Sequence, residues 1–178
     1  FQASSAALRS ADLNRQVGAA IVRSTGEIVA VGCNDVPKAG GDQYWEGDRH
    51  DARDFVLGAD SSAQQREEML SELLGRLREG DFLNPRIDKN NIDSFAKSLL
   101  YGDNKKWLKG AGLMNLVELG RSVHAEMAAI TTAARLGLSV KGTILYSTTF
   151  PCHMCARHIL ASGINEVVYI EPYPKSRA

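Results

Sequence analysis

The chain has 178 residues, a length that suits one domain, and 44% of them are hydrophobic, as is typical of a globular protein with a sizeable core. Its 21 basic side chains balance 21 acidic ones, so it lacks the basic excess of most proteins that bind along a polynucleotide, and a small substrate is favoured. No apolar run reaches the roughly 18 residues that a membrane-spanning helix needs, and no charged-then-apolar leader opens the chain.

The N-terminal part predicts a helix followed by a β-hairpin. Residues 3–14 are rich in Ala and Ser, with apolar positions at helical spacing, which predicts a short helix. Two runs enriched in β-branched residues follow at 17–23 and 27–32, and the Ser-Thr-Gly turn between them indicates an antiparallel hairpin. Residues 34–41 contain Pro and paired Gly residues and are predicted to form a loop.

Residues 38–120 differ in character from the flanking sequence and form a largely helical insert. Residues 64–79 predict a helix with one apolar face, and residues 94–101 predict a shorter helix. Packing of the apolar face on the domain is the ordinary interpretation, and an oligomer or lid surface is the alternative. The apolar face comprises Met69, Leu70, Leu73, Leu74 and Leu77.

Regular structure returns at residue 123. Residues 123–136 are rich in Ala and contain no helix breaker, so they predict a helix, which Gly137 ends. A strand at 143–147, a helix at 152–161 and a strand at 166–170 follow. Strand–helix–strand at this spacing implies a right-handed crossover between parallel strands. We therefore expect an α/β layered fold whose mixed sheet combines an antiparallel hairpin with parallel strands.

Two short motifs carry metal-binding chemistry: His124-Ala-Glu126 and Pro-Cys152-x-x-Cys155. A catalytic Zn²⁺ usually has three protein ligands and an open fourth position, and His124, Cys152 and Cys155 make up such a set. Cys-x-x-Cys at the first turn of a helix lets both sulfurs reach one ion, and the helix N-terminus favours their thiolate form. Glu126 is then expected to take a proton from the metal-activated water and to deliver it to the ring nitrogen and the departing amine.

The spacing of the first motif restricts where its helix can begin. Two residues correspond to about 200° around a helix, so His124 and Glu126 reach one site only if His124 lies near the first turn. A structural zinc site is the alternative, and only His153 and His158 lie nearby to supply a fourth ligand. Three cysteines, two of them three apart, favour a metal pair over a disulfide framework, and thus a reducing, cytoplasmic location.

The combination of His-x-Glu with Pro-Cys-x-x-Cys is the signature of zinc-dependent nucleobase deaminases. The chain further resembles the deoxycytidylate deaminases in residues 14–22 (NRQVGAAIV), 31–37 (VGCNDVP), 146–152 (YSTTFPC) and 161–164 (ASGI). The likeness covers about residues 4–37 and 121–173 and does not extend to the insert. Within the family it is most similar to the anti-phage dCTP deaminases, by its VPKAGG continuation, its long insert, the ELGR lead-in to His124 and its EPYPKS tail.

The resemblance implies a cytidine deaminase-like three-layer α/β/α fold in one deaminase domain, 1–178, with its core at about 3–37 and 121–178. It implies hydrolytic deamination of dCTP, dCMP or both to deoxyuridine nucleotides, in antiviral depletion of the nucleotide pool, by a homo-oligomer. The anti-phage proteins carry a P-loop domain ahead of the deaminase. No P-loop motif occurs here and the first residue is Phe1, not Met, so we expect this sequence to be part of a longer chain.

The resemblance also implies substrate contacts. Asn34 would hold the deoxyribose, Thr148 would meet the pyrimidine edge, and Tyr173 could stack on the ring. The phosphates need cation partners, and the candidates are Lys175, Arg15 and Arg121. An ordinary structural role is the alternative for several of these residues: a turn residue for Asn34, a rim residue for Tyr173, and solvated charges for the cations.

The chain departs from the family pattern at two positions and leaves other functions open. Cys33 stands where the family usually has Tyr, and Asp35 where it usually has Gly. The insert offers only His50 and no cysteine, so one Zn²⁺ is predicted rather than two. A deaminase acting on cytosine or adenine in single-stranded DNA or RNA is one rival, and it would need stacking aromatics along a basic track. A zinc-stabilised, inactive regulatory module is the other.

Overall fold

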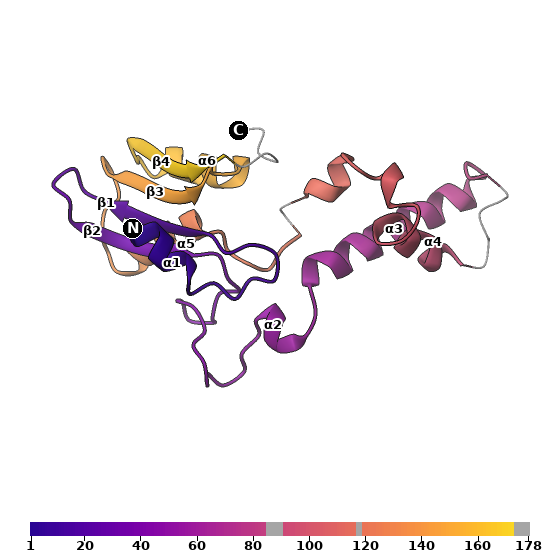
Figure 1. The fold of residues 1–178 in the computed structure, drawn as a ribbon, viewed down its shortest axis with the longest axis horizontal. Coiled ribbons are helices and arrows are strands. Elements are labelled where there is room, and N and C mark those ends of the chain that lie inside the picture. The colour runs from indigo at the N-terminus through magenta and orange to yellow at the C-terminus, as the bar shows by residue number, and fades with distance from the viewer. Residues whose placement is uncertain (85–90, 117–118, 173–178) are drawn as a thin grey trace. The chain divides into compact units, whose positions relative to one another are not determined.

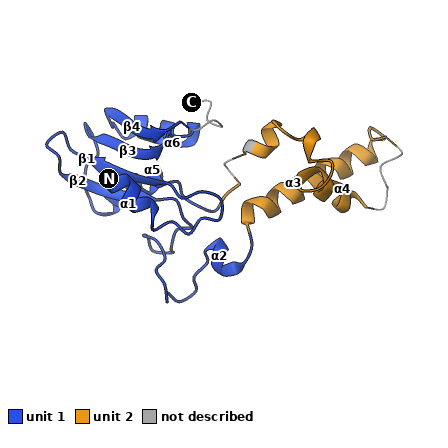
Figure 2. Cartoon of the chain, viewed as in Figure 1, with its two compact units in different colours: residues 1–59, 121–178 blue, residues 60–120 orange. Residues whose placement is uncertain are grey.

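The computed structural model describes residues 1–84, 91–116 and 119–172 and divides the chain into two compact units. Unit 1 comprises residues 1–59 and 121–178, and unit 2 comprises residues 60–120 (Figure 2). The predicted insert therefore begins within unit 1 and supplies the whole of unit 2. That the two units form one domain stays a prediction. In the described ranges, no helix has the length and apolarity to cross a membrane.

Unit 1 is built on a mixed four-stranded sheet with the strand order β2-β1-β3-β4 (Figure 1). Strands β1 (Gly18–Val22) and β2 (Ile28–Cys33) form an antiparallel hairpin. Strand β3 (Ile144–Thr149) pairs antiparallel with β1 and parallel with β4 (Glu166–Glu171). The crossover from β3 to β4 runs through α6 (His153–Ala161), as a parallel pair requires. The predicted α/β fold with a mixed sheet is confirmed.

Helices cover both faces of this sheet (Figure 1). Helix α1 (Gln2–Ala7) lies against the face that contains Gly18, where a Cβ atom would collide with the backbone of α1. Helix α5 (Ala125–Arg135) lies equally close to Gly32. Gly32 pairs with Ala19, the neighbour of Gly18, so the alternation along a strand places the two glycines on opposite faces. The predicted three layers are thus α1, the sheet, and α5 with α6.

The core of unit 1 lies between the sheet and the helices α5 and α6. Ile21 and Leu145 are its largest fully buried side chains, and alanines along α5 let that helix approach the sheet closely. Cys152 and Cys155 belong to the same buried cluster. The beginning of α6 therefore lies in the core.

The first helix is shorter than predicted. Helix α1 ends at Ala7, whereas the prediction extended to residue 14. Side chains beyond it bond the backbone in non-helical conformations. Ser10 donates from Oγ to the backbone oxygen of Asn34 (2.6 Å), and Asp12 accepts at Oδ1 from the N–H of Asn14 (2.9 Å). Ser and Asp compete with helical hydrogen bonds in this way.

The described part of unit 2 is helical. A one-turn helix of unit 1, α2 (Asp54–Leu57), precedes it. Helix α3 (Ser61–Glu79) begins three residues before its predicted start and packs against α4 (Ile92–Leu100). Two short 3₁₀ segments follow, η1 (Lys105–Trp107) and η2 (Gly112–Asn115).

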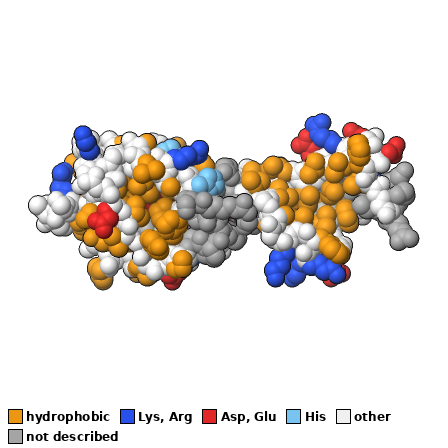
Figure 3. Space-filling model, turned by 90° about the horizontal axis from the view of Figure 1, so that it is seen from above, with side chains coloured by type: hydrophobic (Ala, Val, Ile, Leu, Met, Phe, Trp, Pro, Cys, Tyr) orange, Lys and Arg blue, Asp and Glu red, His pale blue; other side chains and the backbone are white. Residues whose placement is uncertain are grey.

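Only part of the predicted apolar face of α3 is buried. Leu70 and Leu74 pack with Ala96 and Leu100 of α4 in a small core. Hydrophobic side chains also spread over the surface of unit 2 in Figure 3. The large hydrophobic side chains of unit 2 that are most exposed, from 43% to 80%, are Met69, Leu73, Phe82, Tyr101 and Trp107.

Candidate metal centre

The N-termini of α5 and α6 bring the two motifs together. His124 is the N-cap residue of α5, with an extended backbone (φ −69°, ψ 154°). Cys152 is the N-cap residue of α6, also extended (φ −73°, ψ 166°), and Cys155 lies in the first turn. The extended residue before α5 lets His124 and Glu126 turn to the same side, as their two-residue spacing required.

One nitrogen and two sulfurs converge at this point. Nδ1 of His124 lies 3.3 Å from Sγ of Cys152 and 3.4 Å from Sγ of Cys155, and the three ligand atoms lie within 4.8 Å of one another. Tetrahedral zinc bonds would separate a ligand nitrogen from a ligand sulfur by roughly 3.5 Å. The donor set and its spacing therefore fit one tetrahedral Zn²⁺ with a fourth position left for another molecule.

Glu126 lies beside these three side chains. It is only 3% exposed, and its Oε2 lies 3.4 Å from Sγ of Cys155. Burial raises the pKa of the Glu126 carboxyl, because the charged form loses its hydration. A carboxyl in this place can exchange a proton with a molecule in the fourth position.

The three prospective ligands also perturb one another. The hydrogen bond with Cys155, together with that of His124, lowers the pKa of Cys152 to about 3. The same contact with Cys152, together with burial, raises the pKa of Cys155, and the bond to Cys152 raises the pKa of His124. Metal binding requires the thiolate form of both cysteines and an unprotonated Nδ1 on His124, so it is coupled to proton release.

The segment leading into His124 is anchored to the residue after Asn34. The N–H of Val123 donates to the oxygen of Asp35 (2.9 Å), and the N–H of Asp35 donates to the oxygen of Val123 (3.2 Å). Asp35, one of the departures from the family pattern, is buried, and this burial raises the pKa of its carboxyl. The Asn34 loop and the metal motif therefore adjoin.

The side chain of Asn34 bonds within the protein. Asn34 is 9% exposed, its Oδ1 accepts from the N–H of Val17 (2.6 Å), and its Nδ2 donates to the oxygen of Arg15 (2.7 Å). Since the amide carries two N–H groups, one remains for a ligand. Thr148 accepts at Oγ1 from the N–H of Gly18 (3.2 Å). Gly18 pairs with the residue before Asn34, so Asn34 and Thr148 lie at the same end of the sheet.

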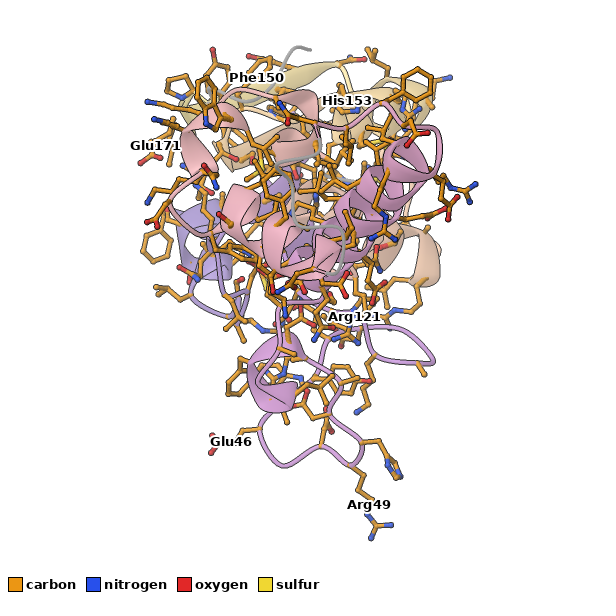
Figure 4. All side chains as sticks on the ribbon, turned by 90° about the vertical axis from the view of Figure 1, so that its right-hand side faces the viewer. Glu46, Arg49, Arg121, Phe150, His153 and Glu171 are labelled. Atoms are coloured by element: carbon orange, nitrogen blue, oxygen red, sulfur yellow. The ribbon has the colours of Figure 1, made fainter. Side chains whose placement is uncertain are left out.

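The predicted phosphate cations contact carboxylates within unit 1. Arg15 pairs with Glu171 (Nη2 to Oε2, 2.5 Å), and Arg121 pairs with Asp54. Arg121 also donates to the oxygen of Ala52 (2.9 Å). Figure 4 shows Arg121 well separated from Glu171, so the two arginines do not converge on one phosphate position. Of the remaining predicted contacts, Tyr173 and Lys175 lie outside the described residues.

Sequence reasoning did not select Asp12 or Ser122, whose side chains bond each other; Ser122 lies two residues before His124 along the chain. Oγ of Ser122 donates to Oδ2 of Asp12 (3.0 Å). The two residues are 110 positions apart, and no local pattern connects them.

Comparisons with known proteins agree with this geometry. The family model described as cytidine and deoxycytidylate deaminase zinc-binding region matches residues 2–171. The deoxycytidylate deaminase of Enterobacteria phage T2 is 47% identical over 55 residues, which are 31% of this chain and 29% of that protein. The ComE operon protein 2 of Bacillus subtilis (strain 168) is 40% identical over 53 residues, 30% of this chain and 28% of that protein. The matched segments thus span less than a third of these relatives.

A likeness in structure extends further along the chain. The apo crystal structure of dCMP deaminase from the cyanophage S-TIM5 superimposes with a TM-score of 0.50. It covers 97% of this chain and 79% of that one at 18% identity, which indicates a shared fold.

Proposed function

This chain belongs to the cytidine and deoxycytidylate deaminase zinc-binding family, and we propose that it deaminates a deoxycytidine nucleotide, dCMP or dCTP, by hydrolysis. The observation that carries the proposal is the convergence of His124, Cys152 and Cys155 beside the buried Glu126. The deoxycytidylate deaminases among its relatives support the choice of substrate class. The products are the deoxyuridine nucleotide and ammonia.

Each residue has a proposed role in this reaction. Nδ1 of His124 and the sulfurs of Cys152 and Cys155 would hold Zn²⁺, which when bound supplies the Lewis acidity that makes water nucleophilic near neutral pH. The Glu126 carboxylate takes a proton from the attacking water and passes it to the ring nitrogen N3. A bond forms between the water oxygen and C4, Glu126 transfers the second water proton to the amine, and the C4–N bond breaks to release ammonia.

The proposed substrate contacts differ in whether their polar groups are already paired within the protein. Asn34 offers one amide N–H at the end of the sheet where Thr148 also lies. For Arg15 or Arg121 to bind phosphate, the phosphate must compete with the carboxylate that each arginine already contacts. We retain Tyr173 and Lys175 as further proposed contacts.

A substrate panel tests the proposal. Ammonia release would be measured with zinc-loaded protein and dCMP, dCDP, dCTP, cytidine and a cytosine-containing single-stranded oligonucleotide. We expect turnover of dCMP, dCTP or both, and the ratio of their kcat/KM values to report phosphate preference. Turnover of none of the nucleotides would refute the proposal, and turnover of the oligonucleotide alone would favour the nucleic-acid deaminase instead.

The wider setting is proposed from the family resemblance. We infer that the protein acts as a homo-oligomer on the free nucleotide pool, in antiviral depletion of deoxycytidine nucleotides. A P-loop domain would precede it in the full-length chain. Nucleotide pools measured in infected cells with active and Glu126→Ala protein test this role: equal pools would contradict it.

A further inference from the structure

The backbone that presents His124 is held by a short segment, residues 121–123, which three other parts of unit 1 contact. Val123 exchanges two backbone hydrogen bonds with Asp35. Arg121 bonds the backbone oxygen of Ala52, just before α2, and the carboxylate of Asp54, the first residue of α2. Ser122 is fixed through its side chain, by the 3.0 Å bond from its Oγ to Oδ2 of Asp12.

Asp12 is itself rigidly placed. Its Oδ1 accepts from the N–H groups of Asn14 (2.9 Å) and Arg15 (3.3 Å), so this oxygen closes the turn that follows it. Its backbone oxygen accepts from Nε2 of Gln16 (2.6 Å). Its Oδ2 accepts from Oγ of Ser122.

The turn around Asp12 is in turn fixed to the end of β2. Ser10 donates from Oγ to the backbone oxygen of Asn34 (2.6 Å), and the N–H of Val17 donates to Oδ1 of Asn34 (2.6 Å). The N–H of Ala11 donates to Oδ2 of Asp35 (3.2 Å). Bonds on both sides of Asp12 thus connect its turn to the end of β2, and Asp12 in turn accepts the bond from Ser122.

His124 needs such support because its own helix does not supply it. As an N-cap residue it lies outside the regular helix, and its side chain makes no cap bond. A metal ligand must be held within about 0.5 Å of its binding position. Loss of the bond between Asp12 and Ser122 would free the residue two positions before the ligand.

We propose that Asp12, acting through Ser122, is a positioning residue that holds His124 ready to bind the metal. The inference deepens the proposed zinc site and rests on it. Substitution of groups that support metal ligands typically weakens metal binding about 10–100-fold. Because Ser122 acts through the backbone and not on the imidazole, we expect the lower end of that range.

The test measures the rate at which zinc-loaded protein loses zinc to a chromophoric chelator, together with the melting midpoint of zinc-free protein. Ser122→Ala removes the hydroxyl, and Ser122→Thr restores it. Thr131→Ala is the matched control, because it also removes a hydroxyl, from the helix that His124 caps, and the Thr131 hydroxyl donates to backbone oxygens of that same helix. We expect Ser122→Ala to release zinc about tenfold faster, and Ser122→Thr and Thr131→Ala to stay within about twofold of wild type.

A double substitution shows whether the two residues act together. If Ser122 acts through Asp12, then Ser122→Ala will not accelerate zinc release further in an Asp12→Ala background. Independent, multiplying effects would overturn the proposal. Release of zinc from Ser122→Ala at the wild-type rate would also overturn it. So would faster release from Ser122→Ala accompanied by a lower melting midpoint of the zinc-free protein, if Ser122→Thr showed the same two changes.

Failure of the proposed function gives a different experimental result from failure of the positioning role. Wild-type protein that retains no zinc would overturn both proposals. Wild-type protein that retains zinc but deaminates nothing would overturn the proposed function alone, because the zinc-release experiment needs no substrate.

Discussion

The helices of the two units begin in opposite ways. In unit 2, α3 and α4 start at Asp60 and Asn91, whose side chains accept backbone N–H groups of the first turn at 3.0 and 3.2 Å. In unit 1, α5 and α6 start at His124 and Cys152, and neither side chain makes a cap bond. A side-chain cap stabilises a helix by about 1 kcal/mol. The helices that present the proposed metal centre therefore place prospective ligands at the positions that elsewhere stabilise the helix.

The same two helix pairs differ in packing. Helix α5 packs so closely on β2 that Gly32 has no room for a side chain. Helix α3 has Gly75 in its C-terminal third, with open space where a side chain would stand. Unit 1 thus combines uncapped helix starts with close packing, whereas unit 2 combines capped helices with a small core.

The largest predicted effect is on kcat. It should follow a substitution at the start of a unit 1 helix but not the same substitution in the middle of a unit 2 helix. Glu126→Gln replaces the proposed proton acceptor with an amide, which cannot take up a proton, and should lower kcat by about 10²–10⁴-fold while zinc is retained. Glu68→Gln makes the same change on an exposed position of α3 and should leave kcat unaltered. Steady-state rates and metal content of both variants decide the matter, and full activity of Glu126→Gln would refute the proton-transfer role.

One substitution should have opposite signs in the two units. A Cβ at Gly32 would lie 2.5 Å from the backbone oxygen of Ala125, so Gly32→Ala should lower the free energy of unfolding by about 1–3 kcal/mol. Gly75→Ala should raise it by up to about 1 kcal/mol, because alanine favours a helix and meets no atom there.

Hydrogen exchange in α5 and α3 measures the two effects separately, without assuming that the units unfold together. Equal signs would mean that the difference in packing between the units does not govern their stability.

The features with strong periodicity or specific chemistry were predictable from the sequence. The hairpin, both helices of the metal centre and the pairing of β3 with β4 follow from runs of residues whose local preference agrees with the fold. The His124 position before its helix also follows, because the spacing to Glu126 left little choice. Local preference and tertiary structure agree at these places.

Other features depended on partners far along the chain. The first helix ends early because Ser10 bonds Asn34, 24 residues away. Arg15 pairs with Glu171 and Arg121 with Asp54, at separations of 156 and 67 residues. The periodicity of a sequence contains no information on such contacts. An arginine predicted to bind phosphate, such as Arg15 or Arg121, can therefore already contact a carboxylate.

The capped helices of unit 2 give the next prediction. Asp60→Ala removes the acceptor for the N–H of Ala63 and should destabilise α3 by about 1 kcal/mol, seen as faster hydrogen exchange in its first turns. Asp60→Asn keeps an acceptor oxygen and should change exchange by much less. Since the metal centre lies in unit 1, kcat should not change in either variant. Unchanged exchange in Asp60→Ala would show that the cap does not stabilise α3.

The smallest predicted effect tests whether the missing side-chain cap at the start of α6 lowers the stability of the protein. Serine is among the preferred N-cap residues, so Cys152→Ser should add a cap to α6 and raise the free energy of unfolding of zinc-free protein by about 0.5 kcal/mol. The control Cys33→Ser alters a buried thiol at the end of β2, where no helix begins, and should be destabilising.

Zinc should reverse the first of these results. The wild-type protein gains stability from bound zinc by mass action, whereas Cys152→Ser lacks one thiolate ligand and gains much less. Chemical denaturation of both proteins, first with chelator and then with added zinc, would test this. Cys152→Ser should be the more stable protein with chelator, and wild type the more stable with zinc. If Cys152→Ser instead destabilises the zinc-free protein as much as Cys33→Ser does, then the start of α6 is held by core packing of its sulfur, and the missing cap costs the protein no stability.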